Sequence, residues 1–162
     1  MYRGKILIGL FCAVIATAIL FLVLPQGELA ADPNAELLPL EMLSLKTSAG
    51  KFEFTVEVAD EASERQRGLM FREKMLPTHG MLFDFEETEL VYMWMENTVL
   101  SLDMIFIRPD GTVAKIQTNT IPFSRDIISS GEPVSHVLEL NAGLARQINL
   151  KPNDRVVHRF FE

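Results

Sequence analysis

The sequence has almost no cysteine. Cys12 is the single cysteine among 162 residues, and it lies inside an apolar run near the N-terminus. The rest of the chain can form no disulfide within itself, so its stability must come from a packed hydrophobic core. About 130 residues follow the apolar run, and a domain of that size buries roughly two-thirds of the surface of its unfolded chain, which is enough for such a core.

The standard catalytic signatures are also missing. The sequence contains no G-x-S-x-G, H-E-x-x-H, P-loop or G-x-G-x-x-G pattern. Its three histidines, His79, His136 and His158, lie far apart, without the close spacing of a metal-binding motif. We therefore predict no metal and no cofactor, and these absences favour a binding or interaction role over catalysis.

Positive charge is in short supply. The net charge is −7, from 22 acidic and 15 basic residues, and every acidic residue follows residue 27. An acidic chain is a poor match for nucleic acid and for anionic membrane surfaces. We expect no nucleic-acid partner, and contact with a membrane only through the N-terminal segment.

The N-terminal segment contains one long apolar run. Arg3 and Lys5 precede residues 6–24, which carry no charge, and about 20 such residues span a bilayer as a helix. Two interpretations stay open: a signal peptide with Leu29-Ala30-Ala31 as its cleavage site, or an uncleaved signal anchor. In both, the basic start stays in the cytoplasm and the remainder is exported to the periplasm or the extracellular space, anchored to the membrane if the segment is retained. The predicted organisation is residues 1–31 as signal peptide or anchor, 32–40 as a linker and 41–162 as a β-rich exported domain.

Beyond the linker the pattern is mostly that of strands. Apolar residues alternate with polar ones over 52–58, which indicates a strand with one wet face, whereas 61–68 is typical of a short helix that ends at Gly68. Residues 69–71 are expected in the core. The sequence predicts an α+β, β-rich fold: a single compact domain of mostly antiparallel strands with two short helices, behind an N-terminal apolar helix, with closure of the sheet into a barrel left open. Strands are expected at 42–47, 52–58, 80–85, 91–95, 102–107, 112–117, 134–140 and 155–160, helices at 61–68 and 143–148, and a long irregular stretch at 119–133.

The segment 92–98 stands out because it holds the only tryptophan, Trp94. It places Asn97 where a strand gives way to a loop, a frequent position for binding residues. The alternative is that Trp94 lies in the core and that Asn97 satisfies the backbone of a turn.

Two carboxylates interrupt apolar strands. Asp103 lies within 102–107 and Glu139 within 134–140. A buried carboxylate is costly unless it is paired, so Asp103 is expected to reach solvent, to pair with Arg65 or Arg72, or to accept backbone hydrogen bonds. Alternatively, Asp103 and Glu139 approach each other as an acid–base pair.

A series of short motifs spans residues 57–154. They include Arg65-x-x-Gly68-Leu69-Met70-Phe71-Arg72, Gly80-Met81-Leu82-Phe83, Trp94-Met95-Glu96-Asn97-Thr98, Leu102-Asp103-Met104-Ile105-Phe106 and Val137-Leu138-Glu139-Leu140-Asn141-Ala142-Gly143. In this order they resemble the domain of unknown function family 192, over roughly residues 45–160. The resemblance implies a small β-rich domain, often behind a signal peptide or anchor, and brings no established activity. Glu96 departs from the family's Trp-Met-x-Asn-Thr motif, where a basic residue is typical, so a reaction that needs a cation there would be lost.

Together these residues favour a binding or accessory domain. A groove near Trp94, Asn97 and Asp103, with Arg65 and Glu139 nearby, would hold a small polar ligand or an envelope component such as a sugar. Tryptophan offers a stacking face, and the polar side chains offer hydrogen bonds. The alternatives are a hydrolase or lyase that uses Asp103 and Glu139, and a non-catalytic protein-interaction module with an exposed apolar patch. The oligomeric state stays open.

Overall fold

A computed structural model describes residues 38–161. The predicted signal peptide or anchor and most of the linker lie outside these residues, so they stay predictions. Within the described part of the chain, no helix combines the length and apolar character that crossing a membrane requires.

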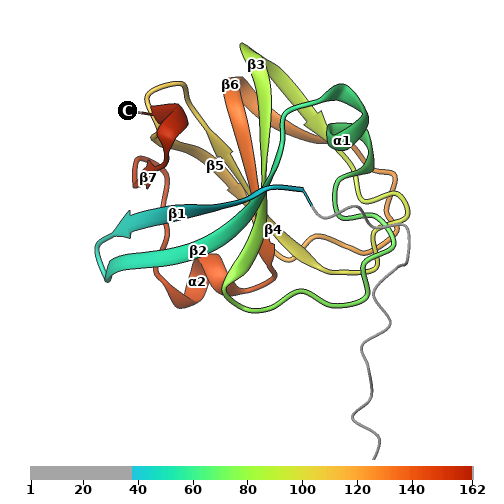
Figure 1. Cartoon of the computed structure of the whole chain (residues 1–162), viewed down its shortest axis with the longest axis horizontal. Helices are drawn as coiled ribbons and strands as arrows, with labels where there is room; N and C mark the ends of the chain where they lie inside the picture. Colours follow the sequence, from blue (N-terminus) through green and yellow to red (C-terminus); the bar gives the residue numbers. More distant parts are fainter. Residues whose placement is uncertain (1–37, 162) are drawn as a thin grey trace, which may run out of the picture. The chain divides into compact units, whose positions relative to one another are not determined.

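Seven strands form one sheet, in the order β5-β4-β6-β3-β2-β1-β7 (Figure 1). All neighbouring pairs are antiparallel except β2 and β3, which are parallel. The predicted β-rich α+β fold with mostly antiparallel strands and two short helices is confirmed. The strands are β1 (Leu40–Thr47), β2 (Gly50–Ala59), β3 (His79–Met93), β4 (Leu102–Ile107), β5 (Val113–Gln117), β6 (Ile128–Asn141) and β7 (Arg155–Val157).

The parallel pair determines where the first helix lies. Parallel strands cannot be joined by a tight hairpin, so the chain between β2 and β3 must cross from one end of the strands to the other. This crossover contains α1 (Ala62–Arg67). Glu61 and Glu64 form a capping box at its start, and the Gly68 N–H donates to Glu64 O at 2.8 Å at its end. The second helix, α2 (Leu144–Gln147), follows β6.

The sheet curls into a half-barrel, and its two edge strands touch at one place. Thr112, just before β5, bridges Arg155 of β7, and the Val156 N–H donates to Gly111 O at 2.8 Å. The closing turn needs glycine at 111, because φ is +81° and a Cβ atom would lie 2.9 Å from Val156 O and from Phe161 Cβ.

Two hydrophobic clusters pack on the opposite faces of the sheet. One contains Ile105 and Leu138, and the other contains Met104 and Val137. All six residues of β4 are buried, which explains why this strand shows no alternation in the sequence. Residues 102–107 were predicted as a strand, and β4 has these bounds and lies between β5 and β6 in the sheet.

Several predicted boundaries are wrong. Residues 80–85 and 91–95 are not two strands, because β3 runs continuously through the acidic segment between them, with a register shift between Asp84 and Glu89. Strand β6 already begins at residue 128, because it follows β3 to its end, so the irregular stretch is shorter than expected.

Two other expectations also fail. Phe71 is exposed rather than in the core, since its backbone takes a left-handed turn with φ of 65°. The last strand, β7, is short and gives way to a 3₁₀ helix, η1 (Arg159–Phe161).

The closing turn can be tested with two glycines of matched backbone. Gly131 has φ of +80° but open space around it, whereas Gly111 has φ of +81° and close neighbours. We expect Gly131→Ala to reduce the free energy of unfolding by about 1 kcal/mol through backbone strain alone. Gly111→Ala should reduce it by roughly 2 kcal/mol more, because atoms of β7 and η1 must move. Urea denaturation measures both, and equal losses would contradict the role of this contact.

Candidate functional site

A cleft of about 290 Å³ lies between α1 and the end of β3. Residues 65–70 form one wall, and Tyr92, Met93 and Trp94 form the other. Buried Phe83 and Glu139 also line it. The cleft therefore has apolar walls, exposed aromatic side chains and one acidic group among its buried residues. Arg65, Trp94 and Glu139, three of the five residues expected at a site, line the same space.

Glu139 is the most unusual residue of the cleft. It lies on β6 between Met81 of β3 and Met104 of β4, and only 4% of it is exposed. Among residues 38–161, no hydrogen bond or ion pair reaches its carboxyl group. Burial alone raises the pKa of Glu139 to about 8, so the group holds its proton at neutral pH.

A second buried glutamate shows what Glu139 lacks. Glu57 is 5% exposed and lies beside Met81 on the parallel pair, but both of its oxygens bind the Arg72 guanidinium. It also accepts a hydrogen bond from the Leu38 N–H at 3.3 Å. Such a bidentate pair is the usual way to hold a buried carboxylate in its charged form. Among residues 38–161, the fold thus supplies a cation for Glu57 and none for Glu139.

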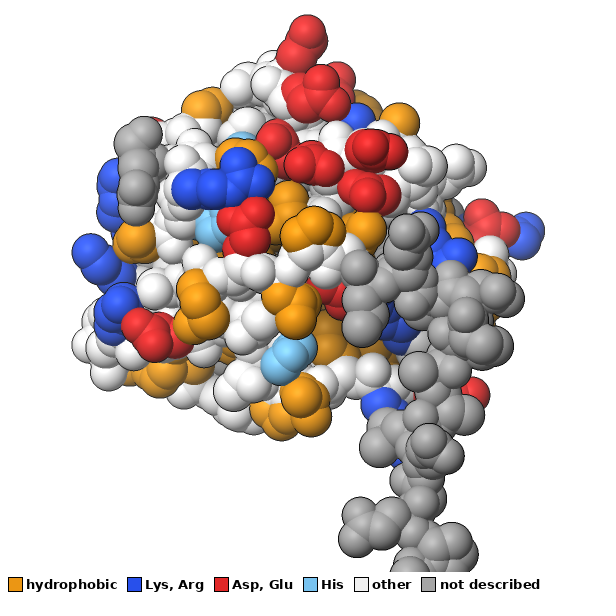
Figure 2. Space-filling view, in the orientation of Figure 1, with side chains coloured by type: hydrophobic (Ala, Val, Ile, Leu, Met, Phe, Trp, Pro, Cys, Tyr) orange, Lys and Arg blue, Asp and Glu red, His pale blue; other side chains and the backbone are white. Residues whose placement is uncertain are grey.

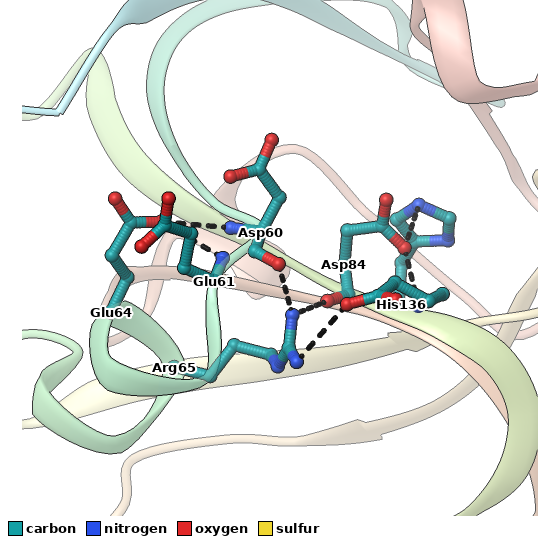
Figure 3. A network of polar contacts seen from close by, with 7 residues as sticks. Asp60, Glu61, Glu64, Arg65, Asp84 and His136 are labelled. Atoms are coloured by element: carbon teal, nitrogen blue, oxygen red, sulfur yellow. Dashed lines mark hydrogen bonds and ion pairs between the residues drawn. The ribbon is translucent and has the colours of Figure 1, made fainter.

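Arg65 is held by the protein itself. Figure 3 shows its guanidinium reaching from α1 to the backbone carbonyls of Asp60 and Asp84, the latter at 2.8 Å. Its Nη2 atom lies 3.3 Å from Glu86, and its guanidinium carbon lies 6.0 Å from the centre of the Phe85 ring. These contacts fasten α1 to β3, so Arg65 forms part of the wall while its charge is compensated elsewhere.

Trp94 does not lie in the core. It is 42% exposed, just past the end of β3, whereas its neighbour Met95 is buried. Asn97 lines a neighbouring hollow that shares Trp94 and Met70 with the cleft. Its φ of 57° and the hydrogen bond from the Phe71 N–H to its carbonyl oxygen, at 2.9 Å, give it a turn-forming role as well.

Asp103 lies away from the cleft. It is fully buried, and its two oxygens accept hydrogen bonds from the N–H groups of Asn119 and Ala145, each at 2.9 Å. It thereby caps the start of α2 from a neighbouring strand. Of the options left open by the sequence, backbone hydrogen bonding is the one realised, and neither Arg65 nor Arg72 pairs with it.

The expected acid–base pair does not form. Asp103 is in register with Leu140, and Glu139 is in register with Met104. Residues in register on adjacent strands share a face, and consecutive residues face opposite sides. The carboxyl groups of Asp103 and Glu139 therefore point to opposite faces of the sheet. They cannot act together on one substrate, which contradicts the hypothesis of a hydrolase or lyase that uses this pair.

A serine–histidine–aspartate arrangement, which the sequence analysis missed, occurs on β6 and β3. Ser135 Oγ lies 2.8 Å from His136 Nδ1. On the other side of the ring, His136 Nε2 lies 3.4 Å from Asp84, and Figure 3 shows these two side chains. Both Ser135 and His136 are buried, and the imidazole packs 4.7 Å from the Phe161 ring. Burial lowers the pKa of His136 to about 4. A hydroxyl without access to substrate cannot act as a nucleophile, so this cluster belongs to the packing of η1 on the sheet.

Comparisons with known proteins agree with the architecture. A model of the DUF192 family, described as "Uncharacterized ACR", matches residues 44–158. A solved structure from Sinorhizobium meliloti 1021, provisionally named a transcription regulator, is 50% identical over 74% of this chain and 94% of that chain, with a TM-score of 0.72. A protein of unknown function from Novosphingobium aromaticivorans DSM 12444 is 32% identical over 80% of this chain and 91% of that chain, with a TM-score of 0.75. A comparison with curated proteins found no match.

The role of Asp103 predicts a loss of stability. Asp103→Ala leaves two buried N–H groups without an acceptor, so we expect the free energy of unfolding to fall by about 3 kcal/mol in urea denaturation. Glu87→Ala, at an exposed position of β3, is the control and should change it by less than about 0.5 kcal/mol. A variant Asp103→Ala as stable as the control would refute the capping role.

The protonation state of Glu139 predicts that the free energy of unfolding depends on pH. Burial raises its pKa from the ordinary 4.5 to about 8 in the folded chain, so the folded chain holds an extra proton between these pH values. The contribution of this proton to the free energy of unfolding is fully present below about pH 4.5 and is lost as the pH rises towards 8. Glu139→Gln cannot ionise, so its stability should not fall in this way. The difference in free energy of unfolding between the variant and the unaltered chain should therefore shift in favour of the variant by on the order of 4 kcal/mol from pH 5 to pH 8. Urea denaturation at both pH values measures this difference, and parallel profiles would show that Glu139 is not buried as an acid.

Proposed function

The chain belongs to the DUF192 family of uncharacterized proteins, and we propose that its domain is a binding module that holds a small ligand in the cleft beside Glu139. The observation that carries this proposal is a nearly buried carboxyl group that lines an open space and has no partner among residues 38–161. A ligand that reaches this group would supply the hydrogen bonds that no described side chain gives it.

The make-up of the cleft supports the same function. Ligand sites are mostly apolar concave surfaces with a few placed polar groups, and 290 Å³ lies at the lower end of their usual size. Trp94 and Tyr92 offer ring faces against which a flat or apolar ligand can pack. The site is also rigid, because Glu139 lies on a strand that is paired on both sides and Arg65 fastens α1 to β3.

The cellular place of this module rests on the sequence. Basic residues followed by the apolar run of residues 6–24 support export, so the ligand would be a small polar molecule of the periplasm or the cell surface, such as an envelope sugar. The Sinorhizobium relative is named a transcription regulator, but we do not extend nucleic-acid binding to this chain. Its net charge of −7 opposes binding to the negatively charged phosphate backbone.

A second candidate function, a protein-interaction module, rests on a different surface. Three large apolar side chains of the segment between β5 and β6 are exposed, namely Ile121, Phe123 and Ile127. Their combined exposure supports contact with another protein. If this is their role, Phe123→Ala should impair capture of a partner and leave the cleft unchanged.

Trp94 separates a binding role from a structural one. We expect Trp94→Ala to change the free energy of unfolding by no more than about 1 kcal/mol, because the ring is partly exposed, whereas a core tryptophan would cost about 3–5 kcal/mol. The same variant should weaken ligand binding at least about ten-fold, since it removes a packing face. Leu76→Ala is the control, because Leu76 is exposed outside the cleft.

A thermal-shift screen of the full chain tests the proposed function. It uses envelope sugars, small amines, carboxylates and peptides, and a ligand at 100 times its dissociation constant stabilises the fold by about 2.7 kcal/mol. We expect at least one hit that Trp94→Ala abolishes and Leu76→Ala retains. A flat screen on a well-folded chain would overturn the proposal and shift the search to a protein partner.

A further inference from the structure

The glutamates that the fold buries divide by whether a cation accompanies them, whereas buried Asp103 accepts two backbone N–H donors instead. Glu57 has Arg72, and the partly buried Glu41 has Arg159 and His158. Glu139, as buried as Glu57, has no basic partner among the described residues. A carboxylate in an apolar environment is tolerated when an opposite charge and hydrogen bonds satisfy it. The group that would satisfy Glu139 is therefore absent from the described part of the chain itself.

We propose, on the basis of the proposed binding function, that the ligand of the cleft carries a basic nitrogen, such as a primary amine, that ion-pairs with the Glu139 carboxylate. The ammonium would lie beside Glu139 and donate hydrogen bonds to its oxygens. The remainder of the ligand would extend past Phe83, Phe85 and Met93 towards Trp94 and Tyr92.

The other charged and titratable groups of the cleft are compatible with a cation at this position. They are Arg65 and Arg67 from α1 and Tyr92 from β3. Arg65 is turned towards Glu86 and two backbone carbonyls, so its charge is compensated outside the cleft. Arg67 is exposed, whereas Glu139 is almost fully buried. The ligand's positive end therefore belongs at Glu139.

The surroundings favour a cation as well. Figure 2 shows acidic side chains gathered over the part of this face where α1 and β3 lie. Exposed Glu86, Glu87 and Glu89 belong to β3, and Glu61 and Glu64 begin α1. A field of this sign raises the local concentration of small cations near the cleft. The faces of Trp94 and Tyr92 add a weak attraction for an ammonium group as it enters.

Binding would displace one proton. In the free chain the Glu139 carboxyl group is neutral. As the ammonium ion enters, the O–H bond of Glu139 breaks, its proton passes to solvent, and the carboxylate accepts the N–H donors of the ligand. Below the pKa of Glu139, affinity for the amine would rise about ten-fold for each unit of pH, because the carboxylate form becomes more accessible.

The experiment compares two probes of the same shape, 2-phenylethylamine and 2-phenylethanol, on the full chain. Trp94 is the only tryptophan, so its fluorescence reports binding in the cleft. We expect the amine to bind at least ten-fold more tightly than the alcohol at pH 7.5. Glu139→Gln should abolish this preference, whereas Glu89→Gln, at an exposed position of β3, should preserve it.

A second measurement uses the unaltered chain, so its result does not depend on whether the Glu139 variant folds. Calorimetric titration of the amine at pH 6.5, in two buffers of different ionisation enthalpy, should show release of about one proton for each amine bound. Equal binding of amine and alcohol, with no proton release, would overturn the amine inference and leave the proposed binding function intact. Failure of both probes would also overturn it, and the broader thermal-shift screen would then decide the proposed function separately.

Discussion

The parallel pairing of β2 with β3 is the constraint on which the rest of the structure depends. A parallel neighbour cannot be reached through a hairpin, so residues 60–78 must cross from one end of the sheet to the other. That crossover carries α1 and the segment that lines the cleft. Strand β3 then continues past the end of β2 and pairs only with β6 along its second half. The space between α1 and this extended part of β3 is the cleft.

The three buried carboxyl groups of Glu57, Asp103 and Glu139 differ in how the cost of burying them is met. Glu57 is compensated by a bidentate arginine, and Asp103 by two backbone N–H groups of a helix start and a loop. In both, the fold itself supplies the donors to the carboxyl oxygens. Glu139 has neither kind of partner within the described part of the chain, and burial raises its pKa to about 8. A fold that satisfies two buried carboxyl groups and leaves a third beside an open cleft provides the clearest chemical reason to place a ligand there.

Local signals in the sequence predicted many of the elements. Strand β2 and helix α1 lie where alternation over 52–58 and the terminal Gly68 indicated them. The failures occurred where pairing with a distant strand overrides local composition. Residues 86–89 are acidic and resemble a loop, but β6 holds the segment around them in β3. Of the residues predicted for a site, Trp94, Arg65 and Glu139 line one cleft and Asn97 lines the adjoining hollow, whereas Asp103 accepts a hydrogen bond from the start of α2.

The sequence by itself determined the class of the fold, the family, the acidic charge and the residues whose chemistry was out of place. It did so because hydrophobic periodicity, turn residues and charge are local properties of the chain. Only the tertiary structure decided which of the two out-of-place carboxyl groups lines a cleft. Asp103 and Glu139 lie on adjacent strands, and their registers with Leu140 and Met104 send them to opposite faces. Register depends on which strands pair and where, and this is a property of the whole sheet.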